Sequence, residues 1–172
     1  MKILLTKGRY YFKERDITYN VENDIILELE NSLYIISGNN GIGKTAFLEF
    51  LLLPLLKRNK LNFAYLEQNK NNQLYTIESS LAFCNKLDRS KDIYLNWLEV
   101  LDYPKIIVAD EFDKYSSSFT KILSTNISCI FLVSHLKDVQ SKIQFKNINN
   151  INIYLKNNKE RVIKIEKKYK ND

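Results

Sequence analysis

The segment with the clearest chemical signature lies between positions 38 and 45 and reads Gly38-Asn-Asn-Gly-Ile-Gly-Lys-Thr45. It fits the pattern G-x-x-x-x-G-K-[ST], in which glycines let successive amide N–H groups turn inward around phosphate oxygens. Three of the four glycines of the chain lie in this segment. A helix that begins at its end would direct its positive N-terminus at the same anion. The pattern therefore predicts a loop that binds the phosphates of a nucleotide.

The loop pattern also predicts roles for individual side chains. Lys44 would reach the β- and γ-phosphates and act in catalysis, and the hydroxyl of Thr45 would ligate Mg²⁺. ATP and Mg²⁺ are therefore the expected cofactors. The predicted nucleotide-binding residues are the loop and the residue after it: Gly38, Asn39, Asn40, Gly41, Ile42, Gly43, Lys44, Thr45 and Ala46.

A pair of carboxylates follows a hydrophobic run in Lys105-Ile-Ile-Val-Ala-Asp-Glu111. Such a run predicts a buried strand, and ligand sites of parallel sheets lie at the carboxyl ends of their strands. Asp110 is therefore expected to hold Mg²⁺ through water, and Glu111 to act as the general base on the attacking water.

The elements that must position these residues indicate an α/β fold. Three runs without alternation, at 32–37, 106–109 and 129–133, predict strands that are buried on both faces of a mainly parallel sheet flanked by helices. Antiparallel strands are expected at both ends of the chain, at 24–30 and in a hairpin of 151–155 with 161–166.

Further elements lie between these strands. Residues 61–66 predict a short strand, 45–53 a helix that Pro54 ends or kinks, and 75–102 a mostly helical region. Within that region, Trp97, Leu98 and Leu101 are expected on one buried face.

Several of these segments, in this order, resemble the ATP-binding cassette (ABC) ATPases. Tyr103-Pro-Lys-Ile-Ile-Val-Ala-Asp-Glu111 resembles the Walker B region of that family, and Tyr65-Leu-Glu-Gln68 resembles its Q-loop. Phe131-Leu-Val-Ser-His135 is similar to its switch strand. The resemblance covers roughly residues 1–155 and implies a P-loop NTPase fold and ATP hydrolysis.

The same resemblance implies further site residues. Gln68 would contact Mg²⁺, and His135 would contact the γ-phosphate as a third catalytic residue. Either Tyr11 or Phe12 would stack on adenine. Thr76-Ile-Glu-Ser-Ser-Leu-Ala-Phe83 is similar to the stretch where transporter cassettes meet their membrane partner.

The chain departs from the family in three places. Leu87-Asp-Arg-Ser-Lys91 stands where members carry a glycine-containing signature that grips the γ-phosphate of the opposite subunit. Phe112-Asp-Lys-Tyr-Ser-Ser117 lacks the usual motif after Walker B. The helical subdomain is reduced to about residues 70–102. We therefore expect slow ATPase activity from the chain alone.

Composition bounds the remaining function classes. With 172 residues, 45% of them hydrophobic, we expect one domain over residues 1–172 and not a disordered chain. Two cysteines and one histidine argue against a disulfide framework or a zinc module, and favour a reducing compartment. The net charge of +6 is carried by dispersed lysines, so we do not expect nucleic acid as a partner.

The expected function is the nucleotide-binding subunit of an ABC-type transporter. It would be cytoplasmic, peripheral on the inner face of the cell membrane, with separate transmembrane subunits and a second nucleotide-binding subunit as partners. Two alternatives remain: a soluble ABC-type ATPase that acts on nucleic acid, and a regulatory ATP-binding module with little hydrolysis. Substrate and direction of transport are not encoded in any motif.

Overall fold

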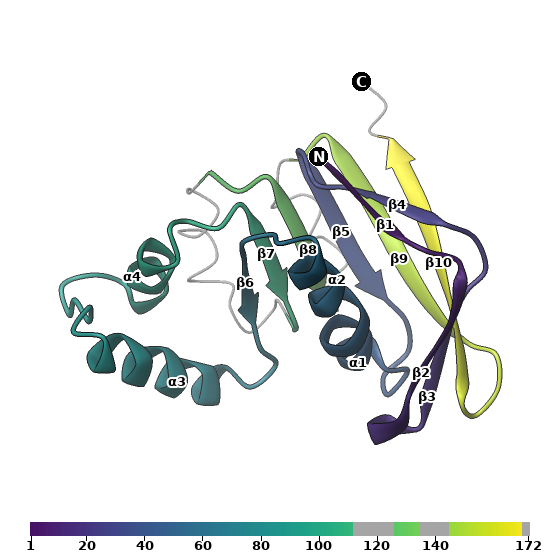
Figure 1. The fold of residues 1–172 in the computed structure, drawn as a ribbon, viewed down its shortest axis with the longest axis horizontal. Helices are drawn as coiled ribbons and strands as arrows, with labels where there is room; N and C mark the ends of the chain where they lie inside the picture. Colours follow the sequence, from purple (N-terminus) through teal and green to yellow (C-terminus); the bar gives the residue numbers. More distant parts are fainter. Residues whose placement is uncertain (112–125, 135–144, 170–172) are drawn as a thin grey trace.

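A mainly parallel sheet organises the fold. The computed structural model describes residues 1–111, 126–134 and 145–169, and among these residues eight strands form one sheet in the order β2-β3-β10-β9-β5-β8-β7-β6 (Figure 1). Strands β9, β5, β8, β7 and β6 pair in parallel, as do β10 and β3, whereas β9–β10 and β2–β3 pair antiparallel. The predicted α/β class is thereby confirmed. The strand bounds are β2 Gly8–Phe12, β3 Ile17–Val21, β5 Ser32–Ser37, β6 Phe63–Leu66, β7 Ile106–Ala109, β8 Cys129–Val133, β9 Asn147–Leu155 and β10 Glu160–Tyr169.

Helices cover both faces of the central strands. On one face lies a continuous helical segment made of α1 (Lys44–Phe47), the π-helical turn η2 (Leu48–Leu52) and α2 (Leu53–Arg58), together with a small antiparallel sheet of β1 (Lys2–Leu5) and β4 (Ile25–Glu28). On the other face lie α3 (Lys70–Phe83) and α4 (Ile93–Val100). A short 3₁₀ turn, η1 (Lys13–Arg15), joins β2 to β3.

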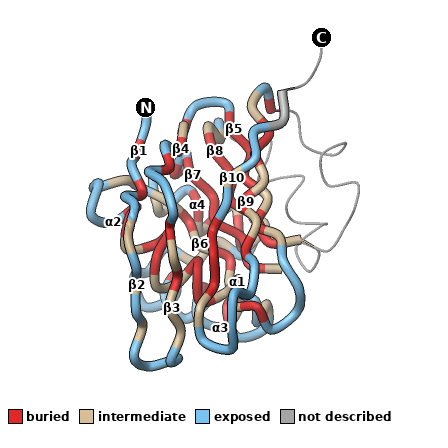
Figure 2. Tube along the Cα trace, turned by 90° about the vertical axis from the view of Figure 1, so that its right-hand side faces the viewer, coloured by how far each residue is buried: buried red, intermediate tan, exposed pale blue. Residues whose placement is uncertain are grey.

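The sequence of β7 shows why this strand has no polar face. Ile106 and Val108 pack in the core under α1 and α2, whereas Ile107 and Ala109 pack in the core under α3 and α4. All four residues are buried, as Figure 2 shows for the centre of the molecule. A strand covered on both sides gains stability from apolar residues at every position, which explains the lack of alternation.

The structure gives the details of two expectations about helices. Pro54 does not end the helix, which continues to Arg58, because the amide of Leu53 reaches back to the carbonyl of Leu48 in a π-type bond. This wider turn precedes the residue that has no amide hydrogen to donate. The region 75–102 is mostly helical, as predicted, and a loop divides it between α3 and α4; Leu98 is buried there, and Trp97 and Leu101 are partly buried against the same core.

The expected antiparallel strands at the two chain ends are present. Residues 1–28 contribute β1 to β4, and β4 has the alternating burial of a strand with one wet face. The C-terminal hairpin is longer than its predicted segments, running from Asn147 to Tyr169. Within the described ranges, no helix is both long and apolar enough to cross a membrane.

Candidate nucleotide site

The predicted phosphate loop connects β5 to α1, as the strand–loop–helix arrangement of a P-loop requires. β5 ends at Ser37, and Gly43 precedes the helix with a positive φ of 102°. Lys44 is buried, and its Nζ donates to the carbonyls of Gly38 at 2.9 Å and Asn39 at 3.2 Å. The lysine ammonium therefore lies at the first two residues of its own loop. Phosphate oxygens could replace these two carbonyls as its hydrogen-bond acceptors.

The other predicted residues reach the same place because the strands run in parallel. β5, β8, β7 and β6 all end at one edge of the sheet, so the residues that follow them are neighbours. Asp110 follows β7 directly, and its amide donates to the carbonyl of Leu66 at the end of β6, at 2.8 Å. This bond joins the ends of β7 and β6 and brings Gln68 beside Glu111.

A cavity of about 490 Å³ lies at this edge. It brings together most of the residues predicted from the sequence, and three that were not. The predicted residues that line it are Asn40, Gly41, Gly43, Lys44, Thr45, Ala46, Gln68, Asp110 and Glu111; the others are Arg15, Ile17 and Val133.

The burial and hydrogen bonding of the Asp110 carboxylate are those expected of a metal ligand. It is almost fully buried, and within the described part of the chain its Oδ2 has no hydrogen-bond partner. Burial raises the pKa of this carboxyl, and the nearby charge of Glu111 raises it further; hydrogen bonds from Thr45 and from the Glu111 amide, and the charge of Lys44, act in the opposite direction. A divalent cation would meet the carboxylate and the Thr45 hydroxyl together, so the residues present fit Mg²⁺.

Glu111 is held in an unusual conformation beside Gln68. Its φ of 53° lies in the left-handed region, which non-glycine residues rarely occupy and which is found at functional sites. The side chain of Gln68 donates through Nε2 to Oε1 of Glu111. The carboxylate that was predicted to act as a base is thus oriented by Gln68, the residue predicted to contact Mg²⁺.

Some predicted residues lie elsewhere. The side chain of Ile42 is buried in the core, and Gly38 and Asn39 contribute carbonyls to Lys44 without lining the cavity. His135 lies outside the described residues, as does the segment 112–117.

Neither aromatic residue predicted to stack on adenine lines the cavity. Phe12 packs against Phe50 and Tyr19, with ring centroids 5.4 and 6.0 Å apart, because it faces the core from β2. Tyr11 is exposed, and its hydroxyl donates to Asp16. Arg15, at the end of the same hairpin, lines the cavity in their place.

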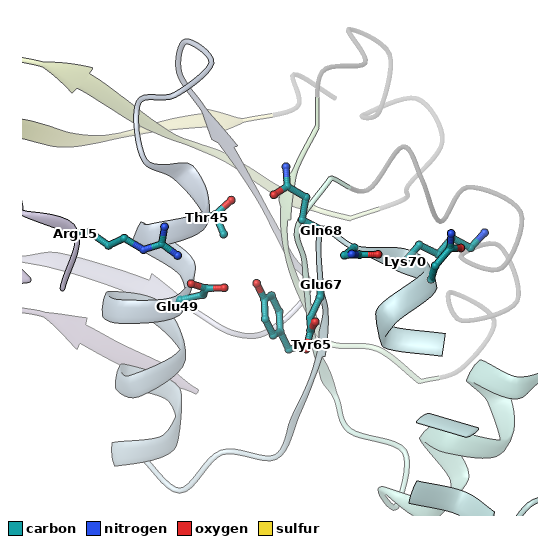
Figure 3. A pocket seen from close by; sticks show the side chains of 9 residues that line it. Arg15, Thr45, Glu49, Tyr65, Glu67, Gln68 and Lys70 are labelled. Carbon is teal, nitrogen blue, oxygen red and sulfur yellow. The ribbon is translucent and has the colours of Figure 1, made fainter. Parts of the chain in front are cut away.

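A second cavity of about 750 Å³ adjoins the first and shares Arg15, Thr45 and Gln68 with it. Figure 3 shows Glu49 on the helix after the phosphate loop and Tyr65 on β6, with side chains that extend toward the space between these elements. Glu49 lies in no motif, and the motif of residues 65–68 assigns no role to Tyr65; the two residues come together only through the packing of this helix against β6.

Gln73 is a positioning residue that the sequence analysis missed. It is buried in α3, and its amide bonds to the backbone on both sides of Leu66: Nε2 donates to the carbonyl of Tyr65 at 2.6 Å, and Oε1 accepts from the amide of Glu67 at 2.9 Å. This clamp holds the end of β6, one residue before Gln68. The one signal in the sequence for this role is a polar residue on a helix face that is otherwise apolar.

Comparisons with known proteins give limited guidance. No family model and no curated protein matches the sequence. Among solved structures, the chain is similar to a KaiC-like protein from the hyperthermophilic archaeon Pyrococcus horikoshii OT3, with 12% identity over 83% of each chain and a TM-score of 0.46. It is also similar to the genome packaging NTPase of Sulfolobus turreted icosahedral virus 2, solved with ATP-gammaS, with 15% identity over 74% of this chain and 78% of that chain and a TM-score of 0.41. Values this low transfer no residue role, so the function has to follow from the geometry of this chain.

Proposed function

We propose that the chain binds ATP with Mg²⁺ at the phosphate loop and hydrolyses it, with Glu111 as the general base. The observation that carries this proposal is the meeting in one cavity of Lys44, at the start of α1, with Asp110 and Glu111, which follow β7. A cation for the phosphates, a buried carboxylate for the metal and a base for the water are the parts that phosphoryl transfer to water requires.

The chain's own residues suggest how binding proceeds. The amides of the loop and the N-terminus of α1 receive the phosphates, and Lys44 exchanges the carbonyls of Gly38 and Asn39 for phosphate oxygens. Thr45 and Asp110 would hold Mg²⁺, which supplies charge neutralisation on the β- and γ-phosphates.

The proton of the attacking water would pass to Glu111. Gln68 donates to Oε1 of Glu111 and so fixes the orientation of the carboxylate that would accept this proton. The water and its base are then oriented by one amide side chain before the reaction begins, which lowers the reorganisation that the transition state requires.

Arg15 is the best candidate for contact with the base of the nucleotide. It is the longest side chain of the β2–β3 connection that lines the cavity, and a guanidinium plane stacks on aromatic rings. It would thereby take the role that Tyr11 or Phe12 was predicted to fill.

We further propose, at a finer level, that the chain works as the nucleotide-binding subunit of an ABC-type transporter with separate membrane subunits. The order of its motifs supports this, and so does α3, whose outer surface leaves Tyr75 and Phe83 exposed where cassettes of transporters contact their partner. Membrane association and a second nucleotide-binding subunit are part of the same proposal.

The ATPase proposal is tested with three variants and one binding assay. Lys44→Ala should abolish measurable ATP binding. Glu111→Gln should bind ATP as the parent does but lose about 10²- to 10⁴-fold in turnover, the usual contribution of a general base. Glu99→Gln, which removes a carboxylate of α4 that pairs with Lys91 far from the cavity, is the control and should change neither. Unchanged turnover in the Glu111 variant would refute the assignment of the base.

The transporter proposal is tested by capture. Tagged Glu111→Gln protein is loaded with ATP and Mg²⁺ in its own cells, extracted with mild detergent and purified. A polytopic membrane protein that is lost when Lys44→Ala is added supports the proposal. Nuclease-sensitive nucleic acid in its place supports the soluble alternative, and capture of neither with intact ATP binding supports the regulatory module.

A further inference from the structure

The phosphate loop is held from below by two buried polar side chains of neighbouring strands. Tyr19 in β3 and Arg161 in β10 are direct partners in the parallel register of these strands. The hydroxyl of Tyr19 donates to the carbonyl of Gly43, and Nε of Arg161 donates to the carbonyl of Ile42 at 3.1 Å. Consecutive carbonyls of the loop are therefore bound by consecutive strands of the sheet.

The direction of these carbonyls decides where the loop's donors point. In a trans peptide, the C=O and N–H of one peptide unit face opposite ways. The carbonyl of Ile42 shares its unit with the amide of Gly43, and the carbonyl of Gly43 shares its unit with the amide of Lys44. Holding both carbonyls in this direction therefore turns both amides toward the phosphate side. The carbonyl of Gly43 also accepts from the amide of Phe47 at 2.8 Å, so Tyr19 and helix α1 hold it together.

Gly43 is required by this arrangement for two reasons. Its φ of 102° is strained for any residue with a Cβ. A Cβ at this position would also lie 2.6 Å from the hydroxyl oxygen of Tyr19. The close approach of the Tyr19 phenol to the loop backbone thus explains why position 43 is a glycine. The phosphate-loop pattern contains this glycine but does not give that reason.

Tyr19 and Arg161 are both buried, and burial affects how each of them binds the loop carbonyls. Tyr19 is fully buried, and burial raises its pKa far above the ordinary value, so the phenol stays protonated and remains a donor at any pH that the fold tolerates. Arg161 is also buried, and its Nη1 donates to the carbonyl of Asn158 at 3.4 Å. Its guanidinium places a positive charge behind the loop that is proposed to receive phosphates.

We propose that Tyr19 and Arg161 are positioning residues for nucleotide binding, which preset the amides of Gly43 and Lys44 toward the phosphates. The proposal rests on the proposed ATP site and adds that β3 and β10, which lie outside the sequence motifs, contribute to the affinity of the loop. Because the same amides bind the phosphates before and during the reaction, loss of either residue should raise KM and leave kcat little changed.

The test compares Tyr19→Phe with Tyr34→Phe. Tyr34 is an equally buried tyrosine whose hydroxyl bonds to the backbone amide and carbonyl of Glu28 at 2.7 and 3.0 Å, on a part of the core that does not line the cavity. Each variant loses one buried hydroxyl and keeps the ring. By isothermal titration with ATP and Mg²⁺, Tyr19→Phe should bind about three- to tenfold more weakly, the range of one hydrogen bond, and Tyr34→Phe should bind as the parent does.

A second variant, Arg161→Gln, and a second measurement, amide spectra, also test the positioning role. Arg161→Gln should weaken ATP binding about tenfold or more, since a charged donor is lost. In ¹H–¹⁵N spectra without nucleotide, the amide resonances of Gly43 and Lys44 should shift in Tyr19→Phe and stay in place in Tyr34→Phe.

Equal affinity of Tyr19→Phe and Tyr34→Phe for ATP would overturn the positioning role, even if the parent binds ATP and Lys44→Ala does not. Should the parent bind no ATP at all, the proposed function fails by itself, and the amide spectra still decide whether the two side chains orient the loop. Unshifted resonances of Gly43 and Lys44 in Tyr19→Phe would then overturn the inference.

Discussion

At the scale of the residue, the proposed metal binding by Asp110 and its burial favour opposite protonation states of the carboxyl. Its carboxylate must be ionised to hold a cation, yet it is almost fully buried and burial raises its pKa above the ordinary value of 3.8. The folded state therefore binds this proton more tightly than the unfolded chain does. It follows that this group lowers the stability of the fold as the pH rises from the ordinary range of aspartate through the raised pKa.

Asp110→Asn should consequently stabilise the protein while it removes metal-dependent function. Without nucleotide at pH 7, we expect an increase in Tm of about 2–4 °C, the shift that roughly 1 kcal/mol produces in a domain of this size. The gain should disappear below about pH 3, where the parent carboxyl is protonated as well. Differential scanning calorimetry across pH measures it.

The control for this prediction is Asp102→Asn, which changes an exposed carboxylate that does not line the cavity. It should leave Tm and its pH dependence close to those of the parent. Addition of ATP and Mg²⁺ should raise the Tm of the parent and of Asp102→Asn, but not that of Asp110→Asn. A lower Tm of Asp110→Asn at pH 7 would contradict the account of Asp110.

At the scale of the element, carboxylates of the chain itself bind the backbone amides at and just before the N-terminus of α4. The carboxylate of Asp92 caps this helix, accepting from the amides of Tyr94 at 3.1 Å and Leu95 at 3.4 Å. In the preceding turn, Asp88 accepts from the amide and hydroxyl of Ser90, and these bonds lower its pKa. These donors are thus already bonded to carboxylates of the chain itself, and under the proposed function they are not open to a phosphate of a second subunit.

Because Asp92 serves the helix and not the nucleotide, Asp92→Ala should separate stability from binding. Loss of an N-cap costs about 1 kcal/mol, so Tm should fall by about 2–4 °C. The affinity for ATP should be unchanged, since α4 does not line the cavity. Asp92→Asn keeps a capping oxygen and should remain within about 1 °C of the parent. An ATP affinity that falls with the cap would show that α4 takes part in the site.

At the scale of the whole molecule, the order of the strands determines which residues meet at the nucleotide site. β8 stands between β5, which leads into the phosphate loop, and β7, which leads into Asp110. All the functional groups described here lie at one edge of the sheet, with α3 and α4 to one side (Figure 1). Under the proposed function these groups form one half of a hydrolytic site, and Asp88 and Asp92 occupy backbone amides on the surface that would complete the site of a second copy.

Turnover by the isolated chain should therefore be slow and should not depend on self-association. We expect a rate well below about 1 s⁻¹, against a median near 10 s⁻¹ for enzymes. The rate per chain should stay constant over a 100-fold range of protein concentration, roughly the range that reveals micromolar dimerisation. A coupled ATPase assay measures this. A rate per chain that rises steeply with concentration would show that two copies form a competent site.

What the sequence by itself determined is local chemistry and the burial of strands. The phosphate loop, the pair Asp110 and Glu111, and the doubly buried strands are recognisable because each is a short segment whose residue types are dictated by its immediate surroundings. For the same reason the α/β class and the antiparallel ends were predictable, and most of the motif residues do meet in one cavity.

What only the tertiary structure decided are contacts between segments far apart in the chain. Arg161 reaches Ile42 across 119 positions, and Gln73 holds the end of β6 from a helix on the other face. Arg15 lines the cavity where an aromatic residue was predicted, because the alternation of β2 turns Phe12 into the core. No local pattern marks such residues, since their role depends on which strands pair and in which register, and that follows from the packing of the entire core.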